Sequence, residues 1–119
     1  MQYDLRREVV RMLEGLWIVQ YVGLQGSGGG AVVLVNGKVL GGDTGYTYIG
    51  TYAVENNVLT GRIRVSNFLP EIPNVLGVKG DFDLDLRAPV SNAVIRGTMS
   101  LVGQPGAGIA VKMTKKAEL

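Results

Sequence analysis

The stretch DFDLDLRA, residues 81–88, alternates acidic and apolar side chains and decides the fold. Successive side chains of a β-strand point to opposite faces of its sheet. The three aspartates therefore share one face, and the apolar residues between them share the other. A segment of this kind is a strand with one solvated and one buried face, as antiparallel sheets commonly have.

Three further segments repeat this period of two, namely VLTGRIRVSNF (58–68), NAVIRGTMSLV (92–102) and GIAVKMT (108–114). Each carries apolar side chains on one face and polar or charged side chains on the other. Four such strands in succession predict a single shared interior. The side chains expected to line this interior are Trp17, Leu59, Ile63, Phe82, Leu84, Met99 and Met113.

The first half of the chain also reads as strands joined by tight turns. Asn-Gly at 36–37 and Asn-Asn at 56–57 stand between apolar runs, which favours two-residue hairpins. The pattern gives about eight short strands at roughly ten-residue spacing. Because only 69–80 is long enough for a crossover, we expect an all-β antiparallel up-and-down barrel of about eight strands rather than a Greek-key sandwich.

Glycines interrupt this first half at three places. The run GSGGG (26–30) is expected to be a flexible hairpin loop, since it lacks the Lys-Ser/Thr ending of a phosphate-binding loop. Gly41 and Gly42 are expected to give the backbone freedom for a turn before Asp43. Gly50, with a tyrosine two residues away on each side, is expected to let the barrel wall curve.

Residues 3–14 form the one convincing helix. Apolar side chains recur there at three- and four-residue spacing, and Gly15 follows as a stop signal. The apolar face is expected to comprise Leu5, Val9, Met12 and Leu13. The chain thus divides into an N-terminal helix extension, 1–14, which is expected to cap an end of the barrel, and a single β-barrel domain, 15–119.

The composition limits the chemistry that the chain can perform. Its 119 residues suffice for one domain with its own core. Cysteine and histidine are both absent, which removes thiolate and imidazole metal ligands and His-dependent nucleophilic catalysis. A net charge of +2 is too small to indicate a nucleic-acid or membrane partner. We expect no metal, no cofactor and no direct nucleic-acid binding.

The N-terminal sequence indicates in which cellular compartment the protein is expected. MQYDLRREVVRML carries charges throughout and has no apolar h-region, so we expect no signal peptide and a cytoplasmic protein. The longest strongly apolar run, AVVLV at 31–35, is too short for a membrane span.

The acidic stripe at 81, 83 and 85 has two interpretations. Its spacing matches the start of a calcium loop, but Leu86 occupies the position of the required glycine. We favour an outward ladder that pairs with Arg62 and Arg64 on the neighbouring strand. No pair of acids has apolar surroundings, so no enzyme is expected; Asp43 in a pocket beside Tyr48, with a perturbed titration, would be the reason to reconsider.

Several short motifs resemble known families. GLW at 15–17, at the head of the first strand, is similar to the G-x-W entry of the calycin barrels. NGKVLGGD (36–43), YIG (48–50) and EIPNVL (71–76), in that order, resemble the GrlR family of type III secretion regulators. The residues that carry this second resemblance are Asn36, Gly37, Gly41, Gly42, Asp43, Tyr48, Gly50, Ile72, Pro73, Val75 and Leu76.

The GrlR resemblance implies a lipocalin-like barrel, a homodimer, and a cytoplasmic negative regulator that restrains a transcriptional activator by binding it. The partner-binding loop of that family is strongly acidic, and the matching residues here are Glu55, Asn56 and Asn57, of which only Glu55 is acidic. The alternative is a carrier of a small apolar ligand inside the barrel. Its expected ligand-binding residues are Trp17, Tyr48, Phe82, Met99 and Met113.

Overall fold

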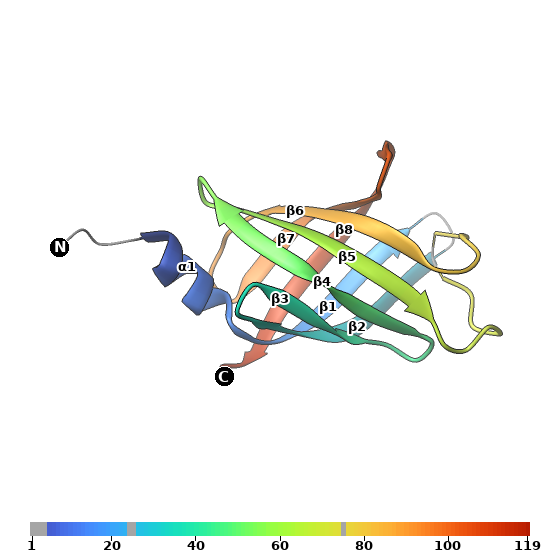
Figure 1. The fold of residues 1–119 in the computed structure, drawn as a ribbon, viewed down its shortest axis with the longest axis horizontal. Coiled ribbons are helices and arrows are strands. Elements are labelled where there is room, and N and C mark those ends of the chain that lie inside the picture. Colours follow the sequence, from blue (N-terminus) through green and yellow to red (C-terminus); the bar gives the residue numbers. More distant parts are fainter. Residues whose placement is uncertain (1–4, 24–25, 75) are drawn as a thin grey trace.

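Eight antiparallel strands follow one another around a closed barrel (Figure 1). The computed structural model describes residues 5–23, 26–74 and 76–119, without the side chains of 5–6 and 105–107. The elements are α1 (Leu5–Leu13), β1 (Gly15–Gly23), β2 (Gly26–Val35), β3 (Lys38–Gly42), β4 (Tyr46–Glu55), β5 (Val58–Asn67), β6 (Phe82–Pro89), β7 (Val94–Leu101) and β8 (Gln104–Ala117). Each strand pairs with the next, and β8 pairs with β1. The expected all-β, up-and-down, lipocalin-like barrel with an N-terminal helix is confirmed.

Three expectations fall on residues outside this description. These are the first two residues of the helix expected at 3–14, the side chain of Leu5 on the apolar face of that helix, and Val75 of the GrlR-like motif.

The alternation of side chains sets which face of each strand is buried. In β6, Phe82, Leu84 and Leu86 are 8%, 6% and 6% exposed, and they lie opposite apolar residues of β5. In the other strands, too, alternate side chains point into the barrel. Among the described residues, none of the buried side chains is charged. The interior predicted from the period of two is therefore the core of the barrel.

Two hairpins have the predicted geometry. Asn36 and Gly37 have φ angles of 50° and 76°, and Asn56 and Asn57 have 51° and 62°. Positive φ at both central residues is the signature of a type I′ turn, whose twist matches that of the flanking strands. Asparagine tolerates this conformation better than most residues do.

The prediction of a flexible loop at 26–30 is wrong. These residues begin β2, and Gly28, Gly29 and Gly30 pair with Tyr21, Gln20 and Val19 of β1. The backbone of a glycine pairs as well as any other, and a strand position that lies against a ring needs no side chain.

Gly41 and Gly42 also differ from expectation, because both lie within β3 and neither has a positive φ. A Cβ on Gly41 would lie 2.0 Å from the carbonyl oxygen of Ala31. Gly50 is similar, since a Cβ there would lie 2.0 Å from the carbonyl oxygen of Arg62. Close approach of neighbouring backbones, rather than freedom for a turn, is what these positions require.

The helix covers one end of the barrel, as expected (Figure 1). Leu13 is 1% exposed, and Val9 and Val10 pack against the core. Met12, which was expected on the buried face, is 40% exposed. Successive helical residues turn by about 100°, so Met12 points away once Leu13 enters the barrel.

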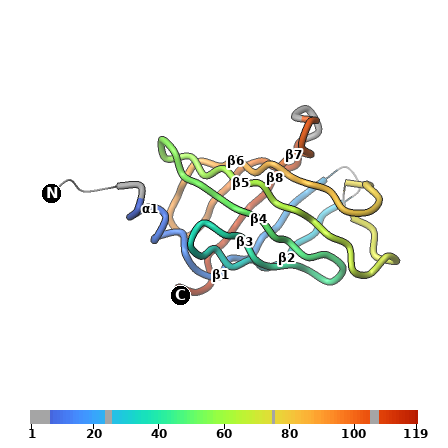
Figure 2. The backbone as a smooth tube through the Cα atoms, in the orientation of Figure 1, coloured from blue at the N-terminus to red at the C-terminus, as the bar shows by residue number. Residues whose placement is uncertain are grey.

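The opposite end of the barrel carries the β3–β4 turn and the long segment that joins β5 to β6, of which residues 68–74 and 76–81 are described (Figure 2). Ile72, Leu76 and Val78 of this segment pack against the core. We call this end the mouth.

The aspartate stripe lies on the outer wall. Arg62 Nε donates to Asp85 Oδ1 at 2.9 Å, and Arg64 Nη1 lies 3.4 Å from Asp83 Oδ1. Arg64 also lies 3.8 Å from Asp81. The predicted cross-strand pairing is confirmed in place of a calcium loop.

Candidate functional site

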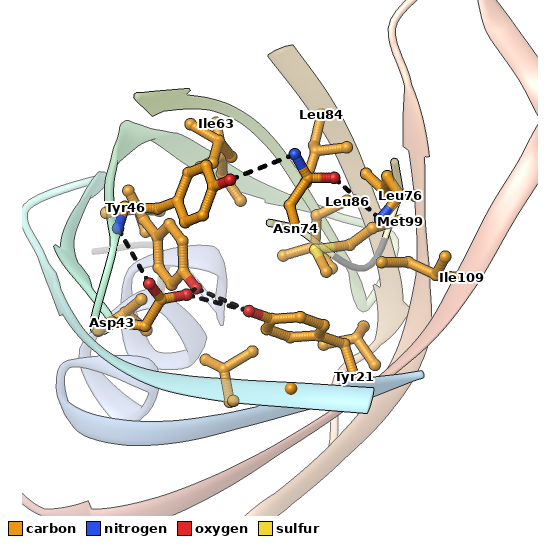
Figure 3. Close-up of a pocket in the computed structure, with 18 of the residues that line it drawn as sticks. Tyr21, Asp43, Tyr46, Ile63, Asn74, Leu76, Leu84, Leu86, Met99 and Ile109 are labelled. Carbon is orange, nitrogen blue, oxygen red and sulfur yellow. Dashed lines mark hydrogen bonds between the residues drawn. The ribbon is translucent and has the colours of Figure 1, made fainter. Parts of the chain in front are cut away.

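A cavity of about 250 Å³ occupies the barrel interior. Most of its wall is apolar, and the described lining contains no Lys or Arg. Figure 3 shows Ile63, Leu84, Leu86, Met99 and Ile109 among the apolar side chains of this lining, together with the polar side chains of Tyr21, Asp43, Tyr46 and Asn74. The barrel is therefore hollow rather than filled by its own side chains.

Most of the expected ligand-binding residues line this cavity. Tyr48, Phe82, Met99 and Met113 do so, as do Leu59, Ile63 and Leu84. Trp17 is not part of the lining. Its ring is 1% exposed at the end of the barrel that the helix covers, and its Nε1 donates to the carbonyl of Leu13 at 2.8 Å. An indole N–H needs a partner when it is buried, and the helix end supplies one.

Two inward glycines leave room for tyrosine rings at the mouth. A Cβ on Gly28 would lie 2.9 Å from Cε2 of Tyr21, and a Cβ on Gly30 would lie 2.9 Å from Cε2 of Tyr48. Both rings therefore lie directly against the β2 backbone. The glycine run thus shapes the cavity wall instead of forming a loop.

Asp43 joins these two tyrosines into a polar cluster. Its Oδ1 accepts hydrogen bonds from the backbone N–H groups of Gly45 (2.9 Å) and Tyr46 (3.0 Å). Its Oδ2 accepts from the hydroxyl of Tyr21 at 3.1 Å and from the hydroxyl of Tyr48. The two hydroxyls also lie 2.9 Å apart. We call Tyr21, Asp43 and Tyr48 the mouth cluster (Figure 3 labels Tyr21 and Asp43).

Burial and the carboxylate keep both phenols protonated. Burial is the largest cause that raises the pKa of Tyr48, and its hydrogen bonds to Asp43 and Tyr21 raise it further. Burial also raises the pKa of Tyr21; a hydrogen bond with Tyr48 opposes the rise, while Asp43 adds to it. Because an ordinary phenol already titrates near 10, both hydroxyls remain donors at neutral pH.

The segment 68–81 closes over part of the mouth. The hydroxyl of Tyr46 donates to the carbonyl of Ile72 at 2.8 Å. Asn74 Oδ1 accepts from the N–H of Leu76 at 2.9 Å (Figure 3). A Cβ on Gly45 would lie 2.8 Å from Cβ of Ile72, so glycine is needed for this contact. Ile72 and Pro73 of the GrlR-like motif, together with Asn74 and Leu76, line the cavity.

Two site residues were missed from the sequence. Tyr21 is absent from the residues predicted to line the interior, although it alternates in step with Trp17 and Val19 and so shares their inward face. That alternation could have placed it inside the barrel. Asn74 lies in the irregular segment between β5 and β6. Side chains do not alternate regularly there, so the sequence does not predict which of them point into the barrel.

Tyr52 occupies the other end of the cavity. It is 7% exposed, and its hydroxyl makes no hydrogen bond within the described part of the chain. Burial raises the pKa of Tyr52; the nearby Gly37 amide opposes this rise without reaching hydrogen-bond geometry.

The residues expected to bind a protein partner lie away from the cavity. Glu55, Asn56 and Asn57 are exposed at the β4–β5 hairpin, at the end of the barrel that carries α1. Glu55 borders a shallow surface depression together with Arg11 and Ala53.

Neither a metal site nor a membrane helix emerges from the described ranges. Within 5–23, 26–74 and 76–119, no three Asp or Glu side chains are grouped to hold a metal ion. In the same ranges, no helix has the length and apolar character needed to cross a bilayer.

Comparison with known proteins found no matching family model and no matching curated protein. The geometry of the cavity and its mouth is therefore the basis for a functional proposal.

Proposed function

We propose that the protein binds a small, mainly apolar molecule inside its barrel. The observation that carries this proposal is the cavity of about 250 Å³, apolar along most of its length and bordered by hydrogen-bonding groups at the mouth. Ligand sites of globular proteins combine these features, a mostly apolar concave wall and a few convergent polar groups.

Packing energetics support a ligand-binding role. Protein interiors are normally packed as densely as organic crystals. The atoms that line an empty cavity have no neighbours on the cavity side, so they lose the dispersion attraction that such neighbours would provide. Here the rings of Tyr21 and Tyr48 lie back against Gly28 and Gly30 and leave the centre open. A bound apolar molecule would restore those contacts.

The mouth cluster supports binding better than acid catalysis. Asp43 does line the cavity beside Tyr48, which is the placement that would call for an enzyme to be reconsidered. A raised phenol pKa, however, makes Tyr48 a poorer proton donor at neutral pH, because an efficient general acid titrates near the working pH. The cluster offers a ligand hydrogen-bonding groups of fixed position.

A fluorescent probe tests the proposal. N-phenyl-1-naphthylamine is neutral, largely apolar and brightens on leaving water, so we expect saturable binding to the wild-type protein. Ile109→Phe should weaken binding at least tenfold, since Ile109 lines the cavity. Ile49→Phe is the matched control, because Ile49 is 56% exposed on the outer wall. Absence of saturable binding, or equal loss in both variants with intact circular dichroism spectra, would contradict the proposal.

A second candidate, a protein-binding role, is favoured by a row of apolar side chains on the outer wall. Leu16, Val33, Leu40 and Ile49 are register partners across β1, β2, β3 and β4. Leu16, Leu40 and Ile49 are 37%, 43% and 56% exposed. Contiguous exposed apolar residues often mark protein contacts. We assign this row to a homodimer contact, in keeping with the GrlR resemblance, which would leave Glu55, Asn56 and Asn57 free to bind an activator.

Sedimentation velocity tests the homodimer. We expect a dimer for the wild-type chain and a monomer for Ile49→Lys, because a lysine within the contact would be buried without a partner. Thr51→Lys, an outward position on the same strand, should remain dimeric. A monomeric wild-type protein at all accessible concentrations would refute this contact.

A further inference from the structure

We propose that the mouth cluster selects ligands whose polar end donates hydrogen bonds, and that it favours a protonated amine over a neutral hydroxyl and a carboxylate. This inference rests on the proposed function, since it concerns the ligand of the same cavity. It follows from the number of protons and the charge that Tyr21, Asp43 and Tyr48 bring together.

The cluster has fewer protons than oxygen–oxygen contacts. Asp43 Oδ2 meets the hydroxyls of Tyr21 and Tyr48, and the two hydroxyls meet each other at 2.9 Å, which makes three contacts. An ionised carboxylate contributes no proton, and each phenol contributes one. Two protons therefore serve three contacts, and the lone pairs that remain are all acceptors. The cluster can accept from a ligand but has no donor to spare.

The groups that hydrogen-bond to Asp43 do not supply the missing donor, and the hydroxyls of Ser27 and Thr44, which also line the cavity, make no hydrogen bond to the cluster within the described residues. The backbone N–H groups of Gly45 and Tyr46 are directed at Oδ1 of Asp43, on the other side of the carboxylate. The hydroxyl of Tyr46 donates to Ile72, and the amide of Asn74 donates to Val78. These bonds fix the carboxylate and leave Oδ2 as the atom that faces the cluster.

The charge of the cluster points to the same ligand class. Both phenols stay neutral because their pKa values are raised, so within the mouth cluster the only charge is the negative charge of Asp43. The described cavity lining has no Lys or Arg to balance it. An ammonium group would supply both protons and charge, whereas a carboxylate head would bring a second negative charge into a partly buried site.

A matched series of eight-carbon ligands tests this inference. Octylamine, 1-octanol and octanoate share an apolar chain and differ in the head group, and calorimetric titration at pH 7 measures each dissociation constant. We expect octylamine to bind about tenfold more tightly than 1-octanol and octanoate to bind most weakly.

Isosteric variants locate the preference. Asp43→Asn keeps the oxygen that receives the Gly45 and Tyr46 N–H groups but removes the charge, so octylamine should fall to the affinity of 1-octanol. Asp85→Asn makes the same chemical change on the outer wall, where Asp85 pairs with Arg62, and should leave the order of ligands unchanged. Tyr48→Phe should weaken octylamine and 1-octanol together, because it removes an acceptor that both use.

The outcomes separate this inference from the proposed function. Equal affinity for the three ligands, tighter binding of octanoate, or an unchanged octylamine preference in Asp43→Asn would overturn the selectivity and leave ligand binding in place. In that case the cluster would only brace β1 and β4 at the mouth. Failure of all three ligands to bind would refute the cavity as a binding site, and the selectivity with it.

Discussion

Removing the hydroxyl of Tyr48 should destabilise the protein, whereas removing that of Tyr52 should not. Both tyrosines lie in β4 on the same inward face, and they are 9% and 7% exposed. The Tyr48 hydroxyl bonds to Asp43 and contacts Tyr21, while the Tyr52 hydroxyl has no partner within the described residues. Tyr48→Phe and Tyr52→Phe therefore delete the same atom from two similar buried positions.

The structure sets the magnitude of this difference. A hydrogen bond to a charged group contributes about 1.5–3 kcal/mol, so Tyr48→Phe should lower the free energy of unfolding by about 2 kcal/mol. At about 2.1 cal/mol/K of unfolding entropy per residue, this loss lowers Tm by roughly 8 °C in a chain of this length. Tyr52→Phe removes a buried polar atom that has no hydrogen-bond partner among the described residues, so its free energy of unfolding should stay at the wild-type value or rise slightly.

Urea unfolding followed by circular dichroism measures both variants against the wild type. The near-equal m-values expected for such small changes would allow the midpoints to be compared directly. An equal decrease in the free energy of unfolding for Tyr48→Phe and Tyr52→Phe, or no decrease for Tyr48→Phe, would refute the reasoning. The hydrogen bond between Tyr48 and the charged Asp43 would then make no contribution to stability.

Three other predictions follow from the same geometry. Because the pKa of Tyr48 is raised in the folded state, its contribution to the free energy of unfolding is complete below about pH 10 and falls above it, by about 1.4 kcal/mol per pH unit. Tyrosinate absorbance at 295 nm should therefore appear for Tyr48 only as the protein unfolds, and a reversible titration of all tyrosines near pH 10 would contradict this. Gly30→Ala should lower the free energy of unfolding by about 1–3 kcal/mol, because its Cβ would lie 2.7 Å from the carbonyl of Gly42 and 2.9 Å from the Tyr48 ring. Gly108→Ala is the control. Its Cβ would have its nearest contact at 3.6 Å, so its urea midpoint should stay close to that of the wild type. Asp85→Asn should leave the urea midpoint near the wild-type value, because exposed ion pairs contribute little to the free energy of unfolding. A large shift of the midpoint would contradict this, since the Arg62–Asp85 pair would then stabilise the fold despite its exposure.

The barrel itself could be predicted because its signals are local. The alternation in 81–88 assigns each side chain to a face, and the Asn-Gly and Asn-Asn pairs at 36–37 and 56–57 specify turns without reference to the rest of the chain. With one apolar face and short connections, an up-and-down barrel is the topology that buries that face most simply.

The errors arose where the reason for a residue lies on a neighbouring strand. Glycine is read as a turn signal in isolation, yet the inward Gly28 and Gly30 make room for rings from β1 and β4, and Gly41 makes room for the β2 backbone. Nothing within 26–30 or 38–42 reveals these neighbours.

The candidate site was predictable only in part for the same reason. The alternation of side chains alone placed Phe82, Leu84 and Met99 inside the barrel, and all three line the cavity. The hydrogen bonds of Asp43 to Tyr21 and Tyr48 depend on how far β1 and β4 are offset from each other along the barrel, and this offset cannot be predicted from the sequence.

A crystal structure of the protein with N-phenyl-1-naphthylamine tests the central claim most directly. We predict that the naphthyl ring lies inside the barrel against Leu84, Met99 and Ile109. A probe bound only on the outer wall beside Leu40 and Ile49, or an interior filled by the protein's own side chains, would contradict it.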